Sequence, residues 1–240
     1  MQPPERSYII WFSQRTGSTL LAAALGDIAG IPGEHLDGKD PTTFTLSDLH
    51  ALWRSGMAPD GLFALKYGPS RNMADWTGAF RRVLELPQEA SVPEVWAAAF
   101  PRCRHMFMTR RNKVRLAVSW WRAIVSGEWH RVNNEAPLTI DLTDRYSFAP
   151  INHLFAECAL REATIEDFFA AADVVPLTVV YEDFARDYQG TVRGVLAHLG
   201  LEGPEIMQPP AFQKMADALS DDWAQRFREE RQEGWDNPAW

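Results

Sequence analysis

The chain has 240 residues and a mass of 27.2 kDa, enough to bury a hydrophobic core without disulfide bonds or a structural metal. It has 46% apolar and 23% charged residues, and no apolar run comes near the roughly 20 residues of a membrane helix, so disordered and membrane-embedded classes are excluded. The formal net charge of −8 argues against a general nucleic-acid-binding protein.

The N-terminal residues and the cysteines bear on the expected location. No apolar segment follows a basic start within Met1–Ser7, so no secretory signal is predicted. Cys103 and Cys158 are too few for a disulfide scaffold. A cytoplasmic location is therefore expected.

The predicted strands are short apolar runs separated by helical patterns. Tyr8–Phe12 is a continuous apolar run, typical of a parallel strand buried on both faces. Further strands are predicted at Leu62–Lys66, His105–Thr109 and Leu177–Tyr181. Helices are predicted around Leu21, Leu25 and Ile28, and over residues 72–86, 92–100, 112–127, 150–172 and 185–199. This alternation predicts an α/β fold, a P-loop-like doubly wound parallel sheet flanked by helices.

Three other segments complete the predicted organisation. Leu36–Gly61 and Gly127–Ser147 look irregular, and such long connections often carry substrate contacts, although plain surface loops remain the alternative. Phe212–Trp240 begins as an amphipathic helix. Since no repeat or linker interrupts the chain, a single domain over residues 1–240 is predicted.

The turn after the first strand has the composition of an anion-binding site. Ser13–Thr19 reads Ser-Gln-Arg-Thr-Gly-Ser-Thr and opens the first helix, where unpaired backbone N–H groups and the helix dipole favour an anion. It is not a Walker A loop, because Ser18 follows the glycine where that motif has lysine. An ordinary helix start, capped by Ser18 or Thr19, is the alternative.

A second cationic segment follows the third predicted strand. Seven of the 24 basic residues lie between Arg102 and Arg122, with no Asp or Glu among them. They include a polar stripe at helical spacing, formed by Arg111, Arg115, Ser119 and Arg122. Arginine with a hydroxyl about two turns later can bind a phosphate group, although a solvated arginine face gives the same pattern.

Taken together, the motifs resemble the cytosolic-type sulfotransferase superfamily, and more specifically bacterial sulfotransferases of the trehalose 2-sulfotransferase type. The resemblance rests on Ser13–Leu21, the Gly30-x-Pro32-x-Glu34 element, Arg110–Ala123 and Ala216–Trp223. It implies a sulfotransferase fold and an enzyme that transfers a sulfuryl group from 3′-phosphoadenosine-5′-phosphosulfate (PAPS) to a hydroxyl group, without a metal.

The same resemblance assigns roles to individual residues. It places the 5′-phosphosulfate on Arg15 together with the loop residues Thr16, Gly17, Ser18 and Thr19. It places the 3′-phosphate on Arg111 and Ser119, with Arg110 as the other arginine that could fill this role. Lys214-Met215 stands where the family often has Arg-Gln before Ala-Asp, so Lys214 keeps a cation for binding the cofactor while the amide is lost.

The resemblance maps the family's catalytic carboxylate onto Glu34. The acceptor hydroxyl needs a general base within hydrogen-bond reach, and Arg15 and the loop amides would stabilise the leaving phosphate. His35 and Asp37 are the alternative bases. Lys66 ends a predicted strand and could face the site, although a lysine there is usually solvated.

The expected acceptor is a carbohydrate or glycolipid, because the family sulfates such hydroxyl groups and tryptophan faces suit sugar rings. Trp120 and Trp129 are the candidate stacking surfaces and His35 a further acceptor contact, whereas Trp121 belongs to the apolar stripe of its helix. A homodimer is a family expectation only.

Two alternative functions remain at this point. A P-loop-type nucleotide kinase would need a Gly-Lys-Ser/Thr loop and a strand ending in a magnesium-binding Asp, but the strand His105–Thr109 runs into Arg110. A non-catalytic nucleotide-binding module would lack the base or part of the phosphate-binding set.

Overall fold

A computed structural model describes residues 2–26, 28–69, 72–136, 138–205, 207–213 and 215–236. The chain forms two compact units. The first unit contains residues 1–109 and 161–210, and the second contains residues 110–160 and 211–240. The expectation of a single domain over residues 1–240 stays a prediction.

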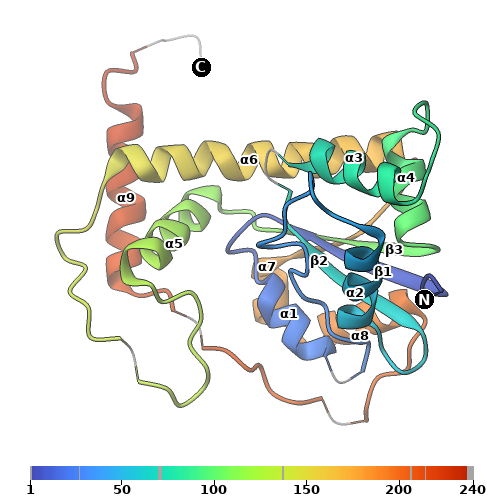
Figure 1. Ribbon diagram of the computed structural model, residues 1–240. Helices are drawn as coiled ribbons and strands as arrows, with labels where there is room; N and C mark the ends of the chain where they lie inside the picture. The colour runs from blue at the N-terminus through green and yellow to red at the C-terminus, as the bar shows by residue number, and fades with distance from the viewer. Residues whose placement is uncertain are drawn as a thin grey trace. The chain divides into compact units, whose positions relative to one another are not determined.

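The first unit is built around a parallel sheet (Figure 1). In the described part of the chain this sheet has four strands in the order β2-β1-β3-β4, and they are β1 (Arg6–Phe12), β2 (Leu62–Tyr67), β3 (Cys103–Thr109) and β4 (Leu177–Val180). The chain passes from β1 to β2 on one side and from β3 to β4 on the other. The carboxyl ends of β1 and β3 therefore flank the point where the strand order reverses, which is where open α/β sheets bind ligands.

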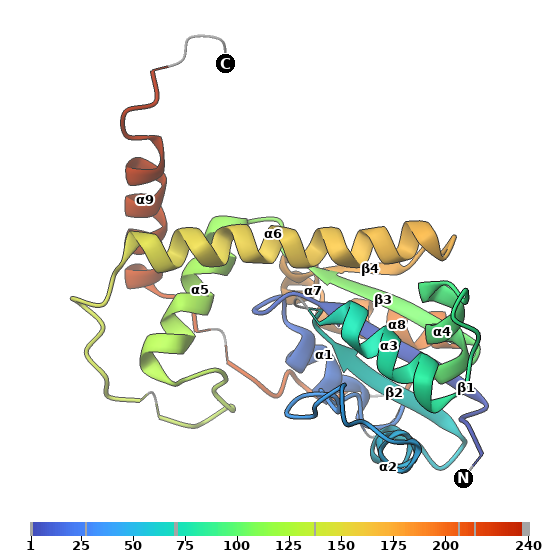
Figure 2. The same ribbon diagram turned by 45° about the horizontal axis from the view of Figure 1, so that its top comes forward.

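Helices cover both faces of this sheet. They are α1 (Ser18–Leu25), α2 (Leu46–Gly56), α3 (Met73–Val83), α4 (Val92–Ala99), the end of α6 (Phe148–Ala171), α7 (Tyr181–Arg186) and α8 (Tyr188–Leu199). Alternate residues of a strand point to opposite faces. Ile9 and Trp11 of β1 pack in one cluster with α2, α3, α4 and α6, whereas Tyr8, Ile10 and Phe12 pack in another with α1, α7 and α8. Figure 2 shows α3 running along one face of the strands. The predicted doubly wound α/β fold is confirmed.

The second unit has its own smaller core. It contains α5 (Lys113–Ser126), the beginning of α6 and α9 (Ala218–Gln232). These helices bury Leu116, Trp120, Ile151, Trp223 and Phe227 against one another. A bridge between Val132 and Phe212 joins the segment after α5 to the segment before α9.

The predicted element boundaries were wrong in three places. The irregular segment Leu36–Gly61 contains α2, because Thr45 and Asp48 cap each other's backbone N–H groups and start a helix there. Tyr181 begins α7 instead of ending β4, so the helix predicted over 185–199 is a pair, α7 and α8. The C-terminal helix starts at Ala218, where Asp217 caps it, and not at Phe212.

Candidate active site

The turn between β1 and α1 is held from within. Ser13 and Thr16 are fully buried, and the Thr16 hydroxyl donates to the Ser13 carbonyl oxygen at 2.7 Å. Arg15 has φ = 66° and Gly17 has φ = 87°, so two left-handed residues lie within three positions. Such backbone is uncommon for a residue other than glycine and clusters at functional sites. The turn therefore has a fixed and strained shape.

The shape of this turn leaves the start of α1 open to an anion. Gly17 is the N-cap residue and has no side chain, and among the described residues no side chain caps α1. The first turn of α1 carries no Asp or Glu either. The first N–H groups of a helix need partners from outside it, and they carry partial positive charge. This turn therefore suits an anion, and the assignment of a phosphosulfate to it, which the resemblance implies, stays a prediction.

Glu34 is attached to the edge strand of the sheet. Its neighbour Gly33 pairs with Leu65 of β2, and the Lys66 N–H donates to the Gly33 carbonyl at 2.9 Å. The Glu34 side chain keeps 36% of its surface exposed, and one of its oxygens lies 2.7 Å from Lys66 Nζ. The carboxylate predicted as the base is therefore both fixed and accessible.

Lys66 also reaches the turn after β1. Its side chain is only 7% exposed, and Nζ donates to the Thr19 hydroxyl at 2.9 Å while it pairs with Glu34. Of the two places considered for Lys66, solvated or facing the site, the contacts with Glu34 and Thr19 support the second. The sequence left both places open for Lys66, because the apolar pattern of β2 does not show whether a cation at the end of the strand is buried.

The two alternative bases have other partners. Nε2 of His35 lies 2.9 Å from the Ile31 carbonyl oxygen, and because a carbonyl only accepts, Nε2 is the donor. The pKa of Asp37 is raised to about 6, first by partial burial and then by a hydrogen bond with Glu34 and the charge of Glu34, while the charges of Lys66 and Arg161 lower it. Glu34 and Asp37 thus form a pair of neighbouring carboxyl groups, and a hydrogen bond between them needs one proton.

A buried carboxylate ties the ends of β1 and β3 together. Glu162 of α6 is 8% exposed and accepts hydrogen bonds from the Ser13 hydroxyl at 3.1 Å and the Thr109 hydroxyl at 3.2 Å. The adjacent Arg161 donates to the Gln14 side-chain oxygen at 2.5 Å. Sequence reasoning missed Glu162 because nothing in a long amphipathic helix marks which carboxylate will be buried.

Two arginines of the predicted polar stripe pair with residues at the start of α9. Arg115 pairs with Asp221 at 2.5 Å, and Arg122 pairs with Asp217 at 2.6 Å and also donates to Ser220. Part of the predicted polar stripe therefore binds the acidic start of α9. Arg111 precedes α5, whose N-cap is Asn112, and Ser119 is a partly exposed residue of that helix.

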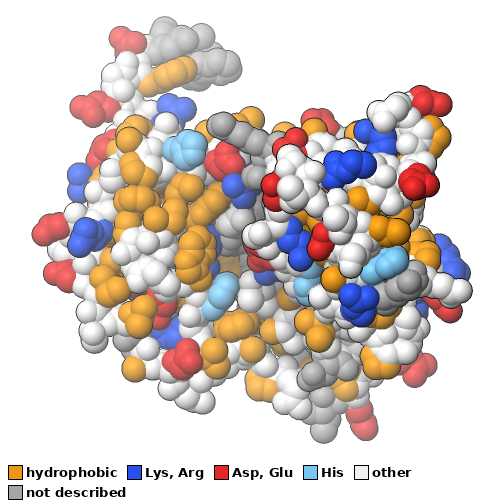
Figure 3. All heavy atoms as spheres, viewed as in Figure 1, with side chains coloured by type: hydrophobic (Ala, Val, Ile, Leu, Met, Phe, Trp, Pro, Cys, Tyr) orange, Lys and Arg blue, Asp and Glu red, His pale blue; other side chains and the backbone are white. Residues whose placement is uncertain are grey.

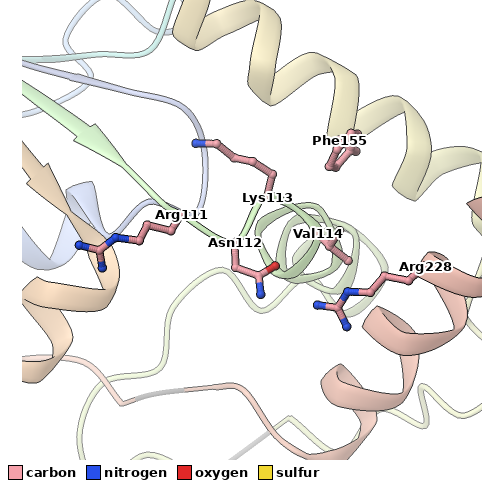
Figure 4. Close-up of a pocket in the computed structure, with 6 residues that line it drawn as sticks. All are labelled: Arg111, Asn112, Lys113, Val114, Phe155 and Arg228. Carbon is pink, nitrogen blue, oxygen red and sulfur yellow. The ribbon is translucent and has the colours of Figure 1, made fainter. Parts of the chain in front are cut away.

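Arg111 lines a pocket of about 490 Å³ in the second unit (Figure 4). The other lining residues are Asn112, Lys113, Val114, Phe155 and Arg228. Arg228 reaches from α9 toward the start of α5, whereas Arg111 points away from Arg228. Among the described residues, three cationic side chains and no carboxylate line the pocket, so it suits an anionic group.

Of the three tryptophans in and after α5, Trp120 differs in exposure from what was expected. Trp120 is only 6% exposed and belongs to the core of the second unit, because it faces the side of α5 that packs on α9. Trp121 is partly buried and its indole N–H donates to the Arg145 carbonyl at 2.8 Å. Trp129 remains 40% exposed, and Figure 3 shows other apolar side chains at the surface of this unit. Trp120 therefore has no exposed face for a sugar ring, whereas Trp129 does.

Lys214, the remaining residue predicted to bind the cofactor, lies outside the described residues.

Comparison with known proteins decides the family. The family model described as Stf0 sulphotransferase matches residues 7–230. The chain belongs to the Stf0 sulphotransferase family. It is similar to the trehalose 2-sulfotransferase of Mycolicibacterium smegmatis, with 26% identity over 94% of this chain and 96% of that one. The trehalose 2-sulfotransferase of Mycobacterium tuberculosis is also 26% identical, over 94% and 95% of the two chains.

Solved structures agree on the fold of this Stf0 sulphotransferase. The sulfotransferase domain of the Synechococcus PCC 7002 olefin synthase aligns with a TM-score of 0.52 and 16% identity, over 95% of this chain and 89% of that one. The sulfotransferase from Alicyclobacillus acidocaldarius aligns with a TM-score of 0.52 and 15% identity, over 96% of this chain and 93% of that one. At such identities the likeness shows the fold alone, and that fold is the sulfotransferase fold.

Family membership settles the choice between the expected functions. The chain is an enzyme, a sulfotransferase that uses a sulfonate donor, and not a P-loop-type kinase or a non-catalytic binding module. In the described part of the chain, no helix is long and apolar enough to cross a membrane.

Proposed function

We propose that this Stf0 sulphotransferase transfers the sulfuryl group of PAPS to a hydroxyl group of a carbohydrate. The observation that carries the proposal is a single buried cation, Lys66, within hydrogen-bond distance of both the Glu34 carboxylate and the Thr19 hydroxyl of the anion-binding turn. A base for the acceptor and a cradle for the donor are thereby held together.

The donor assignment follows the residue types of the two units. In the first unit, Arg15, the hydroxyl groups of Ser18 and Thr19 and the N–H groups at the start of α1 bind the 5′-phosphosulfate. In the second unit, Arg111 and Ser119 bind the 3′-phosphate, with Arg110 as the other candidate. The cationic pocket beside Arg111 supports an anion there.

Sulfuryl transfer resembles phosphoryl transfer in its need for in-line positioning and for stabilisation of the leaving group. The acceptor hydroxyl gives its proton to Glu34 as its oxygen bonds to sulfur. The bond from sulfur to the bridging oxygen breaks, and its electron pair stays on the 5′-phosphate, where Arg15 and the N–H groups stabilise the charge. No step in this scheme needs a metal.

Trehalose is the first acceptor to test, because two curated relatives that match almost the whole chain are trehalose 2-sulfotransferases. The exposed Trp129 offers a stacking face for a sugar ring, and His35, next to the base, is a further acceptor contact. Cytoplasmic location and a homodimer stay predictions, and light scattering tests the second.

Calorimetry with two nucleotides tests the donor assignment. We expect 3′-phosphoadenosine-5′-phosphate to bind roughly ten- to a hundred-fold more tightly than adenosine 5′-phosphate, because the 3′-phosphate gains charge-assisted hydrogen bonds. Arg111→Ala should remove most of that difference, and Arg145→Ala, a change at an exposed arginine of the same unit, should keep it. Equal affinity of the unmodified enzyme for both nucleotides would refute the assignment of the 3′-phosphate.

A further inference from the structure

Lys66 has a place in the site that neither the motifs nor the family comparison assigns. It lies on β2, directly after the residue that pairs with Gly33, and its ammonium group is almost completely withdrawn from solvent. Besides Glu34 and Thr19, the ring of Phe12 lies near it, with the ring centroid 5.1 Å from Nζ. A buried ammonium group is costly unless it is paired, so these contacts fix its position.

We propose that Lys66 is a positioning residue for sulfuryl transfer, which holds the Glu34 carboxylate and turns the Thr19 hydroxyl toward the donor. This inference rests on the proposed function and adds a residue to it. Two features of the geometry carry it, one at each of the partners of the ammonium group.

The first feature concerns the direction of the Thr19 hydroxyl. An ammonium group has donors only, so at 2.9 Å the Thr19 oxygen is the acceptor. The hydroxyl proton must then point elsewhere, and Thr19 lies in the first turn of α1, where the phosphosulfate is proposed to bind. Lys66 thereby makes this hydroxyl a donor toward the anion.

The second feature concerns the path of charge during the reaction. When Glu34 accepts the proton of the acceptor hydroxyl, its negative charge disappears while charge grows on the leaving 5′-phosphate. The ammonium group lies 2.7 Å from the Glu34 carboxylate and 2.9 Å from the Thr19 hydroxyl of the donor turn. It therefore lies beside the negative charge of Glu34 before the proton transfer and beside the turn that binds the leaving phosphate after it. A fixed cation in such a place favours the transition state without moving.

Asp37 provides a readout of Lys66 that needs no substrate. The charged groups that act on the Asp37 carboxyl are Glu34, Lys66 and Arg161, and Asp37 in turn acts on Tyr67. The Asp37 pKa of about 6 is the balance of burial and Glu34, which raise it, against Lys66 and Arg161, which lower it. Removing the charge of Lys66 should therefore raise the titration midpoint of Asp37.

Carbon-13 NMR of the side-chain carboxyl groups measures this midpoint in the full chain. We expect Lys66→Met to move the Asp37 midpoint to higher pH and Lys66→Arg to leave it close to that of the unmodified protein. Lys39→Met, a change at an exposed lysine, serves as the matched control and should not move it. An unchanged midpoint in folded Lys66→Met would show that the ammonium group does not lie beside the Glu34–Asp37 pair, and would overturn the proposal.

A double-mutant cycle with Glu34 tests the role in catalysis. We expect Lys66→Met to lower kcat roughly ten- to a hundred-fold and to change the affinity for 3′-phosphoadenosine-5′-phosphate by less than about threefold, with partial recovery in Lys66→Arg. In a Glu34→Gln background, the fold-loss in kcat caused by Lys66→Met should be at least about ten times smaller, because the carboxylate that Lys66 holds is gone. Equal losses in the two backgrounds would overturn the proposal.

The two tests separate this inference from the proposed function. If the unmodified enzyme sulfates no sugar, the proposed function fails, and the NMR titration still decides whether Lys66 faces the carboxyl pair. If the unmodified enzyme is active and Lys66→Met is equally active, Lys66 has no positioning role and the proposed function stands.

Discussion

Gly17 lies so close to the ring of Tyr181 that a Cβ atom built on it would come within 2.9 Å of Cδ2. Its φ of +87° is a second reason for glycine, because other residues are strained there. We predict that Gly17→Ala lowers the free energy of unfolding by about 1–3 kcal/mol and weakens nucleotide binding, because the turn must shift. Thermal unfolding and calorimetry measure the two effects.

Gly78→Ala is the matched control for this change. Gly78 lies inside α3, and apart from the neighbouring backbone of that helix, no atom of the described residues lies within 4 Å of the place where its Cβ would stand. Alanine should there stabilise the protein by about 0.4–1 kcal/mol and leave nucleotide binding unchanged. A Gly17→Ala variant as stable as Gly78→Ala would show that the turn is not constrained.

Glu34→Gln should separate binding from turnover. We expect 3′-phosphoadenosine-5′-phosphate to bind with unchanged affinity, because Glu34 acts on the acceptor. Turnover should fall roughly a hundred- to ten-thousand-fold, the usual contribution of a general base. Steady-state kinetics with calorimetry on the same preparation measures both.

His35→Gln is the companion variant, since His35 neighbours Glu34 and its ring donates to a carbonyl oxygen. Its turnover should stay within about tenfold of the unmodified enzyme. Full activity in Glu34→Gln together with loss in His35→Gln would move the base to His35.

Asp37 should make folding stability depend on pH. Its pKa is raised from the ordinary 3.8 to about 6, so the folded state holds the proton more tightly than the unfolded state. The stabilisation is complete below pH 3.8 and is lost as the pH rises to about 6. Denaturant unfolding at a series of pH values measures this effect. As the pH rises from 3.8 to about 6, the free energy of unfolding of Asp37→Asn should increase relative to that of the unmodified protein, and above this window the difference between the two should stay constant.

Asp167→Asn is the control, because Asp167 is an exposed aspartate of α6 in the same unit. Its stability should follow that of the unmodified protein across the same pH range. If the free energy of unfolding of Asp37→Asn changed with pH in the same way as that of the unmodified protein and of Asp167→Asn, Asp37 would titrate alike in the folded and unfolded states.

Glu162 is predicted to stabilise the turn after β1 through the Ser13 hydroxyl. Glu162→Ala leaves that fully buried hydroxyl without its acceptor, at a cost of about 1–3 kcal/mol in the free energy of unfolding. Glu166→Ala, at an exposed position one turn further along α6, should cost less than about 0.5 kcal/mol. Similar losses in the two variants by denaturant titration would remove Glu162 from this role.

The sheet could be predicted from the sequence because each strand is an apolar run between turn signals. Tyr8–Phe12 is continuous and apolar, and its residues do pack against helices on both faces. The helix α2 was missed because its segment also contains Asp, Thr and Pro, although the pair Thr45 and Asp48 before an apolar pattern is a readable start signal.

Some features of the candidate site follow from local sequence, whereas others depend on contacts between distant segments. The turn around Gly17 is local, so its glycine and hydroxyl groups indicate an anion site. Lys66 and Glu162 act through contacts with residues 47 and 149 positions away, Thr19 and Ser13, and no periodicity reveals such contacts. The pairing of Arg115 and Arg122 with α9 was hidden for the same reason.

Mass spectrometry of a transfer reaction tests the central claim most directly. The purified enzyme is incubated with PAPS and trehalose, alongside other hydroxylated sugars and glycolipids, with Glu34→Gln as the matched control. We predict that a sugar gains the mass of one SO3 group, that an equal amount of 3′-phosphoadenosine-5′-phosphate appears, and that Glu34→Gln gives almost none of either. Sulfation of no carbohydrate by an enzyme that binds the donor nucleotide, or equal sulfation by Glu34→Gln, would contradict the account.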